Sequence, residues 1–137
     1  MLAEDVVATE AMPPFAASSV DGYAVVAADG PGPRRLVGDQ VAGVVENIRI
    51  EPGTAARVTT GAPVPPGADA VVMVEFAEAG DGVVEILESG TPVGANVRPV
   101  GQDIQPGQRV LAKGTLLGPA ELGLLGTVGR FQVPVFR

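Results

Sequence analysis

The chain has 137 residues, 46% of them hydrophobic, which is enough for one ordinary core or two small lobes. Its net charge of −7 argues against nucleic acid and membrane surfaces as partners, because both attract basic patches. It contains no cysteine and no histidine, which excludes disulfides, thiolate nucleophiles, the usual zinc sites and histidine-based triads. A general acid or base must therefore be Asp, Glu, Lys or Tyr, and a metal should be a hard cation on oxygen ligands, such as magnesium.

The 19 glycines and 13 prolines separate short apolar runs, which is typical of a mainly β protein with many turns. The acidic start, Leu2-Ala-Glu-Asp5, lacks the basic region of a signal peptide. No run approaches the roughly 20 apolar residues of a membrane span. We therefore expect a cytoplasmic protein without a membrane partner.

The first predicted elements are short and end in turns. Residues 2–8 form a short strand or a lead-in segment, and Asp21-Gly22 is a turn dipeptide before a strand that begins at Tyr23. Asp21 either offers a carboxylate at the start of this strand or only makes the turn. Spacing alone favours the turn.

A loop is predicted at 29–33, and Arg34 and Arg35 after it are expected to be solvated. Residues 36–50 are expected to hold one or two strands. The turn that follows, at 50–53, has Pro then Gly, which suits type II.

Residues 57–75 predict a strand, a stiff proline-rich turn at 61–67 and a second, fully covered strand at 70–74. Thr59 and Thr60 lie at the mouth of this turn. A rigid loop on a β scaffold suits ligand contact. The alternative is a proline-rich hairpin corner with threonines chosen for β propensity, and local pattern alone favours it.

The last third predicts a hairpin turn at 79–82 and a short strand at 96–100. Asp103, two residues after Gly101 and ahead of a Pro-Gly turn, either binds a cation or polar ligand or hydrogen-bonds its own backbone, which is the commoner case.

A helix is predicted at 118–129, with Pro119 as its first residue, and a last strand at 131–136. Gly123 and Gly126 would allow close packing, either in the core or at a dimer contact. Four residues are expected to form the apolar side of this helix: Leu122, Leu124, Leu125 and Val128.

Four stretches carry a resemblance to a known family. They are PPFAASSVDGYAV (13–25), RVTTGAPVPPGADAVVMVE (57–75), VRPVGQDIQPGQRVLAKGT (97–115) and GPAELGLLGTVG (118–129). In this order they resemble the N-terminal half of the MoeA-type molybdopterin molybdotransferases, whose eukaryotic counterpart is the E domain of gephyrin. Residues 34–50 carry no recognised motif.

The resemblance implies a mainly β fold, in which an irregular small-sheet β domain is inserted in a second small domain that carries one C-terminal helix. The β domain, at 16–101, would face the active-site cleft. The other domain, at 1–15 and 102–137, would supply dimer contacts. The resemblance further implies an N-terminal fragment that lacks a preceding helical segment and the following pterin-binding domain, and that is inactive alone.

Members of this family insert molybdate into adenylylated molybdopterin, with magnesium, to form molybdenum cofactor. The implied partners are a second copy in a homodimer and a molybdopterin-adenylating protein. The resemblance assigns active-site positions to Asp21, Thr60 and Asp103, and we expect catalytic roles for all three. We further expect metal binding by the two aspartates and cofactor binding by Thr59 and Gly61. Thr60 would hydrogen-bond an oxyanion.

A hypothesis of another class remains: a non-catalytic β module that binds a partner protein or joins subunits. The acidic charge and the many turns fit this hypothesis equally well.

Overall fold

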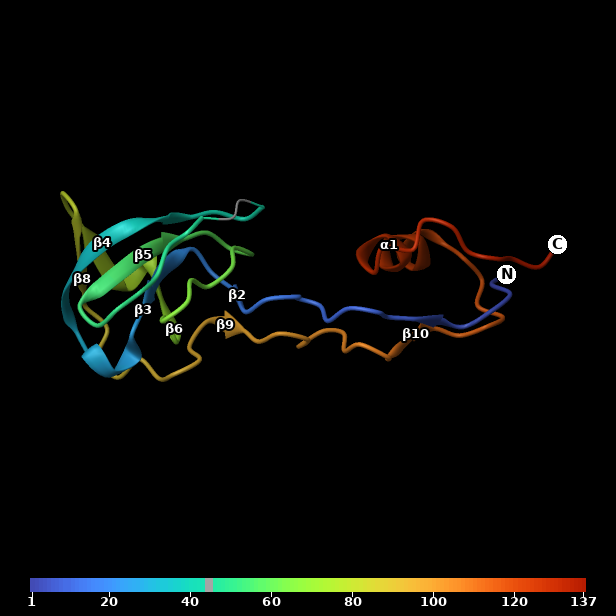
Figure 1. The fold of residues 1–137 in the computed structure, drawn as a ribbon, viewed down its shortest axis with the longest axis horizontal. Coiled ribbons are helices and arrows are strands. Elements are labelled where there is room, and N and C mark those ends of the chain that lie inside the picture. Colours follow the sequence, from blue (N-terminus) through green and yellow to red (C-terminus); the bar gives the residue numbers. More distant parts are fainter. Residues whose placement is uncertain (44–45) are drawn as a thin grey trace. The chain divides into compact units, whose positions relative to one another are not determined.

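The computed structural model describes residues 1–43 and 46–137 and divides into two compact units (Figure 1). Unit 1 comprises Met1–Pro14 and Val100–Arg137, and unit 2 comprises Phe15–Pro99. Which unit supplies dimer contacts and which faces a cleft stays a prediction.

A six-stranded sheet in the order β6-β3-β5-β4-β8-β7 forms unit 2, with a separate pair made by β2 and β9. All neighbours run antiparallel except β4 and β5. The strands are β2 (Ala17–Ser18), β3 (Gly22–Val25), β4 (Gly32–Gln40), β5 (Thr54–Val58), β6 (Ala70–Met73), β7 (Ala77–Ala79), β8 (Val83–Ile86) and β9 (Val97–Arg98). Two 3-10 turns, η1 (Ala27–Asp29) and η2 (Val74–Phe76), lie between strands.

Strand β3 lies between β5 and β6, since Gly22 pairs with both Val58 and Met73. The two strands predicted within 57–75 are thus present but are not neighbours. The hairpin-corner interpretation is wrong, because the proline-rich segment crosses over β3 instead of folding β6 back onto β5.

Apolar side chains cover both faces of the β6-β3-β5 region. One cluster contains Tyr23, Val25, Ala55, Ala70, Val72, Val84 and Ile86, and the other contains Ala24, Ile50, Ala56, Val58 and Val71. The short apolar run at the start of β6 is buried, as expected for a strand covered on both sides.

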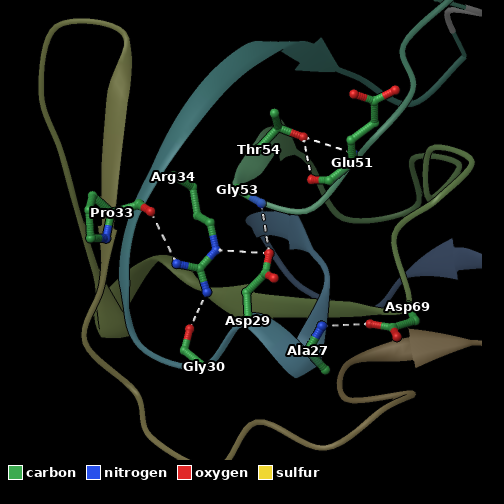
Figure 2. A network of polar contacts seen from close by, with 9 residues as sticks. All are labelled: Ala27, Asp29, Gly30, Pro33, Arg34, Glu51, Gly53, Thr54 and Asp69. Carbon is green, nitrogen blue, oxygen red and sulfur yellow. Dashed lines mark hydrogen bonds and ion pairs between the residues drawn. The ribbon is translucent and has the colours of Figure 1, made fainter.

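Arg34 is buried, with 4% of its surface exposed, so the expectation that it is solvated is wrong. Its guanidinium donates to the carbonyl oxygens of Gly30 and Pro33, and its Nε lies 3.6 Å from Oδ2 of Asp29 (Figure 2). Alternation along β4 turns Arg34 inward and leaves Arg35 exposed.

The segment predicted to hold one or two strands, 36–50, contains the end of β4. Residues 44–45 of this segment lie outside the described residues.

Unit 1 contains β1 (Val6–Val7), which pairs with β10 (Arg109–Leu111), and the helix α1 (Pro119–Thr127). Leu2, Val6, Leu111 and Leu125 form its core. As predicted, Pro119 is the first helical residue. The Gly118 N–H donates to the Glu121 carboxylate at 3.0 Å, which caps the helix start.

The predicted apolar side of α1 is partly wrong. Leu124, Leu125 and Val128 pack in the core, whereas Leu122 is 58% exposed. At 100° per residue the three packed side chains span one arc, and Leu122 lies beyond its edge. A Cβ at Gly123 or Gly126 would meet no described atom within 4 Å, so neither glycine marks a close contact among the described residues.

The predicted last strand at 131–136 is reduced to a single bridge between Leu2 and Val135. Among residues 1–43 and 46–137, no helix has the length and apolarity needed to cross a bilayer.

Candidate functional site

Asp21 and Thr60 meet at one end of the β3–β5 pair. Asp21 immediately precedes β3, and Thr60 follows β5 by two residues. Because Gly22 pairs with Val58 in antiparallel register, the chain beyond β5 returns past Asp21. The Thr60 N–H donates to Oδ1 of Asp21 at 2.8 Å, and the Thr60 hydroxyl donates to the same oxygen at 3.1 Å.

These hydrogen bonds lower the pKa of Asp21. The Thr60 N–H has the largest effect and the Thr60 hydroxyl the next, while the positive charge of Arg57 adds a smaller one. Partial desolvation opposes them. The carboxylate is therefore ionised at neutral pH, and Asp21 and Thr60 are both exposed to solvent. Oδ2 of Asp21 makes no hydrogen bond to a described residue.

Thr59 and Gly61 shape the turn that holds Thr60. The Thr59 N–H donates to the Gln40 carbonyl oxygen at 3.2 Å, and the Gly61 N–H donates to that of Ser18 at 2.8 Å. The Thr59 hydroxyl accepts from the Ala42 N–H at 3.2 Å. Gly61 has a φ of +84°, a conformation that favours glycine. Cofactor binding by Thr59 and Gly61 stays a prediction.

Asp103 belongs to unit 1, where its N–H donates to the Met12 carbonyl oxygen at 2.9 Å. Its side chain is exposed. The structure thus brings Asp21 and Thr60 together, while a shared metal site of Asp21 and Asp103 stays a prediction.

Asp21 can supply one of the oxygen ligands that a magnesium ion requires. Oδ2 is a hard oxygen donor, and magnesium usually takes one or two carboxylates together with waters and substrate phosphates. Within the described part of the chain no group of three or more acidic residues forms a metal site, so a complete protein cage is not built there.

Arg57 was not among the predicted site residues, although it lies on β5 three residues before Thr60. It is the exposed residue of an otherwise buried strand, TAARV. In the sequence, Arg57 is the one charged residue of the stretch TAARV, and this lone charge was the signal that could have identified it.

The model of the family described as the MoeA N-terminal region (domain I and II) matches residues 1–129. Molybdopterin molybdenumtransferase 1 of Mycobacterium tuberculosis is 38% identical, over 98% of this chain and 37% of its own length. Gephyrin of Dictyostelium discoideum is 41% identical over 94% of this chain and 20% of its length. The chain thus spans little more than a third of these relatives at most.

The crystal structure of the molybdopterin biosynthesis MoeA protein from Pyrococcus horikoshii OT3 superposes with a TM-score of 0.91 and 35% identity, over 98% of this chain and 37% of that chain. This likeness confirms the predicted mainly β fold with one C-terminal helix. Since the family match covers all four stretches of the sequence resemblance and the fold agrees with it, the chain belongs to the MoeA N-terminal region family.

Proposed function

We propose that this chain is the N-terminal region of a cytoplasmic molybdopterin molybdenumtransferase, which inserts molybdate into adenylylated molybdopterin to form molybdenum cofactor. The observation that carries the proposal is the Asp21–Thr60 pair, a solvent-exposed carboxylate with one oxygen held by two hydrogen bonds. The names of the relatives, which are molybdenumtransferases, support the reaction class.

Asp21 acts through the oxygen that Thr60 leaves open. Thr60 fixes Oδ1, which leaves Oδ2 of the ionised, solvent-exposed carboxylate available to a ligand. Both substrates are anions, and a negative carboxylate beside them requires a cation. Asp21 and Asp103 are each proposed as oxygen ligands of magnesium, which when bound would offset the charge of the substrate oxyanions.

Thr60 has a positioning role in this proposal, because its N–H and its hydroxyl hydrogen are both directed at Asp21. The hydroxyl oxygen still has acceptor capacity toward a substrate hydrogen. Thr59 and Gly61 are proposed to shape the loop that contacts the pterin substrate.

Unit 1 is proposed to contact a second copy of the chain. Three of its exposed apolar side chains support this: Leu116 is 72% exposed, Leu122 58% and Phe131 86%. An adenylylated substrate must come from an adenylyl-transfer reaction, so a molybdopterin-adenylating protein is the expected second partner. Because the chain covers only 37% of the molybdenumtransferase relative and 20% of gephyrin, we propose that the isolated chain is inactive.

The test is molybdenum insertion by the full-length protein that carries this chain, as wild type, Asp21→Asn and Asp81→Asn. Asp81 is an exposed turn aspartate in the same unit and serves as the control. We expect Asp21→Asn to lower insertion by about 100-fold or more, since a preorganised charged group typically contributes 10²–10³ in rate, with the dimer unchanged in sedimentation. Unchanged insertion would favour the hypothesis of a scaffold that only joins subunits.

A further inference from the structure

Arg57 lies near Asp21 along the β3–β5 pair. Its partner in β3 is Tyr23, and its partner in β4 is Asp39. Asp21 immediately precedes Gly22, and Gly22 lies opposite Val58, the residue next to Arg57. Arg57 and Asp21 are therefore neighbours along this strand pair, at a separation that a long side chain can span.

The N–H donors of the Arg57 guanidinium are available to a ligand. It is exposed, and no hydrogen bond or ion pair joins it to another residue in 1–43 or 46–137. Arg34 differs, because its guanidinium is buried against Asp29 and two carbonyl oxygens. The charge of Arg57 nevertheless acts on Asp21 through space, since it helps to lower the pKa of that carboxyl.

An arginine in this setting suits a tetrahedral oxyanion. Its planar fork presents five N–H donors and can bind two oxygens at once. The chain has a net charge of −7, so an anion that approaches Asp21 needs a fixed positive group close by.

We propose that Arg57 binds a tetrahedral oxyanion of the substrate beside Asp21. This inference rests on the proposed function, which supplies two sources of such a group: molybdate itself and the phosphate of the adenylylated pterin. Arg57 would be a substrate-binding residue, in direct contact with an oxyanion that Asp21 alone would repel.

The experiment measures kcat and KM of the full-length protein, with molybdate varied in one arm and adenylylated molybdopterin in the other. The variants are Arg57→Met, Arg57→Lys and Arg35→Met. Arg35 is an exposed arginine of β4 in the same sheet, so its replacement removes the same charge at another place. Methionine keeps much of the apolar stem that arginine lays over neighbouring side chains.

We expect Arg57→Met to raise one KM by about tenfold or more, because a charge-assisted hydrogen bond to a substrate typically contributes that much. The arm in which KM rises identifies molybdate or the pterin phosphate as the bound group. Arg57→Lys should give a smaller rise, since lysine keeps the charge but loses the fork. Arg35→Met should leave both values within about twofold of wild type, as expected for a surface change.

The inference is overturned if both KM values stay unchanged in Arg57→Met while Asp21→Asn abolishes insertion. It is equally overturned if only the pH profile shifts, since Arg57 would then act on Asp21 alone. If Arg57→Met fails to fold, Arg57→Lys decides, because an unchanged KM in that variant rejects binding through the fork. Unchanged insertion in Asp21→Asn would instead reject the proposed function itself.

Discussion

At the scale of the residue, Thr60 is the neighbour with the largest effect on the Asp21 carboxylate. Both Thr60 donors reach the same oxygen, so half of the carboxylate is fixed and half stays accessible. The backbone donor has the larger effect on the pKa, and it is present whatever residue occupies position 60, proline excepted. The threonine hydroxyl is therefore an adjustable addition to an effect that the backbone already produces.

Thr60→Val should raise the pKa of Asp21 but leave it below the ordinary 3.8, since the hydroxyl donor is lost and the N–H remains. NMR titration of the carboxyl carbon measures this directly. Thr59→Val is the control, because its hydroxyl contacts the Ala42 N–H instead. A pKa of Asp21 that does not move in Thr60→Val would contradict the assignment of its hydroxyl as a donor.

The lowered pKa of Asp21 also determines how the stability of the fold depends on pH. A carboxyl whose folded pKa lies below its unfolded value stabilises the fold above the unfolded value, near 3.8. That contribution is lost as the pH falls from 3.8 through the folded pKa. In Thr60→Val the folded pKa of Asp21 lies closer to 3.8, so the pH range over which this stabilisation is lost should be narrower. Acid unfolding of wild type and Thr60→Val, followed as a function of pH, measures the difference.

The neighbours Arg34 and Arg35 should respond oppositely to the same substitution. Arg34→Met leaves the partly buried Asp29 without its cation and two carbonyl oxygens without donors, and the loss of such hydrogen-bond partners typically costs roughly 1–3 kcal/mol. Arg35→Met removes an exposed charge and should change the free energy of unfolding by less than about 0.5 kcal/mol. Urea unfolding of both variants compares them, and equal effects would contradict the inward orientation of Arg34.

At the scale of the element, β3 depends on the absence of a side chain at its first residue. A Cβ at Gly22 would lie 2.1 Å from the Val72 carbonyl oxygen in the neighbouring β6. The conflict is with backbone, so it cannot be relieved by turning a side chain. At Gly22, β3 and β6 therefore lie so close together that no residue with a side chain fits at this position.

Gly22→Ala should destabilise the protein by about 3 kcal/mol, near the upper end for overpacking, because β3 joins β5 to β6. Gly80→Ala is the matched control, since its Cβ would meet nothing closer than 3.9 Å and its φ is ordinary. Thermal unfolding followed by circular dichroism gives both values. A Gly22→Ala protein as stable as wild type would mean that β6 can shift away from β3.

At the scale of the whole molecule, the sequence predicted which segments are strands better than which strands are neighbours. The β-branched and apolar runs at 54–58 and 70–73 mark strands locally. The insertion of β3 between them depends on pairing with residues more than 30 positions away, which no local pattern encodes. Arg34 has a different cause, because its partners Asp29, Gly30 and Pro33 are close in sequence and its burial follows from its inward position on β4.

The candidate site was accessible to sequence reasoning only in part. Turn chemistry alone predicted only that Asp21 makes a turn, and it was the family resemblance that pointed to Asp21, Thr60 and Asp103 as site residues. Their contact arises because β3 and β5 pair with Gly22 opposite Val58, which is a tertiary fact. Arg57 was missed because a single charge in a strand is ordinarily a solvated face.

The pairing of β2 with β9 has a consequence for the order of folding. Unit 1 is assembled from two segments, and the whole of Phe15–Pro99 lies between them along the chain. Closing so long a loop in an unfolded chain costs conformational entropy that rises with its length. When β2 pairs with β9, Ala17 lies opposite Arg98, so the chain enters and leaves unit 2 at neighbouring positions. Most of the entropy cost of closing the loop has then been met before unit 1 forms.

Unit 2 should therefore fold first. Its β2–β9 pair then holds together the two chain segments from which unit 1 forms. In pulsed hydrogen exchange during refolding, the Gly61 amide, bonded to Ser18, should gain protection before the Ala8 amide, bonded to Gln108. Simultaneous protection would mean that the two units form in one step. A substitution that disrupts the β2–β9 pair, such as Ala17→Pro, should then slow the folding of unit 1, although residue 17 belongs to unit 2.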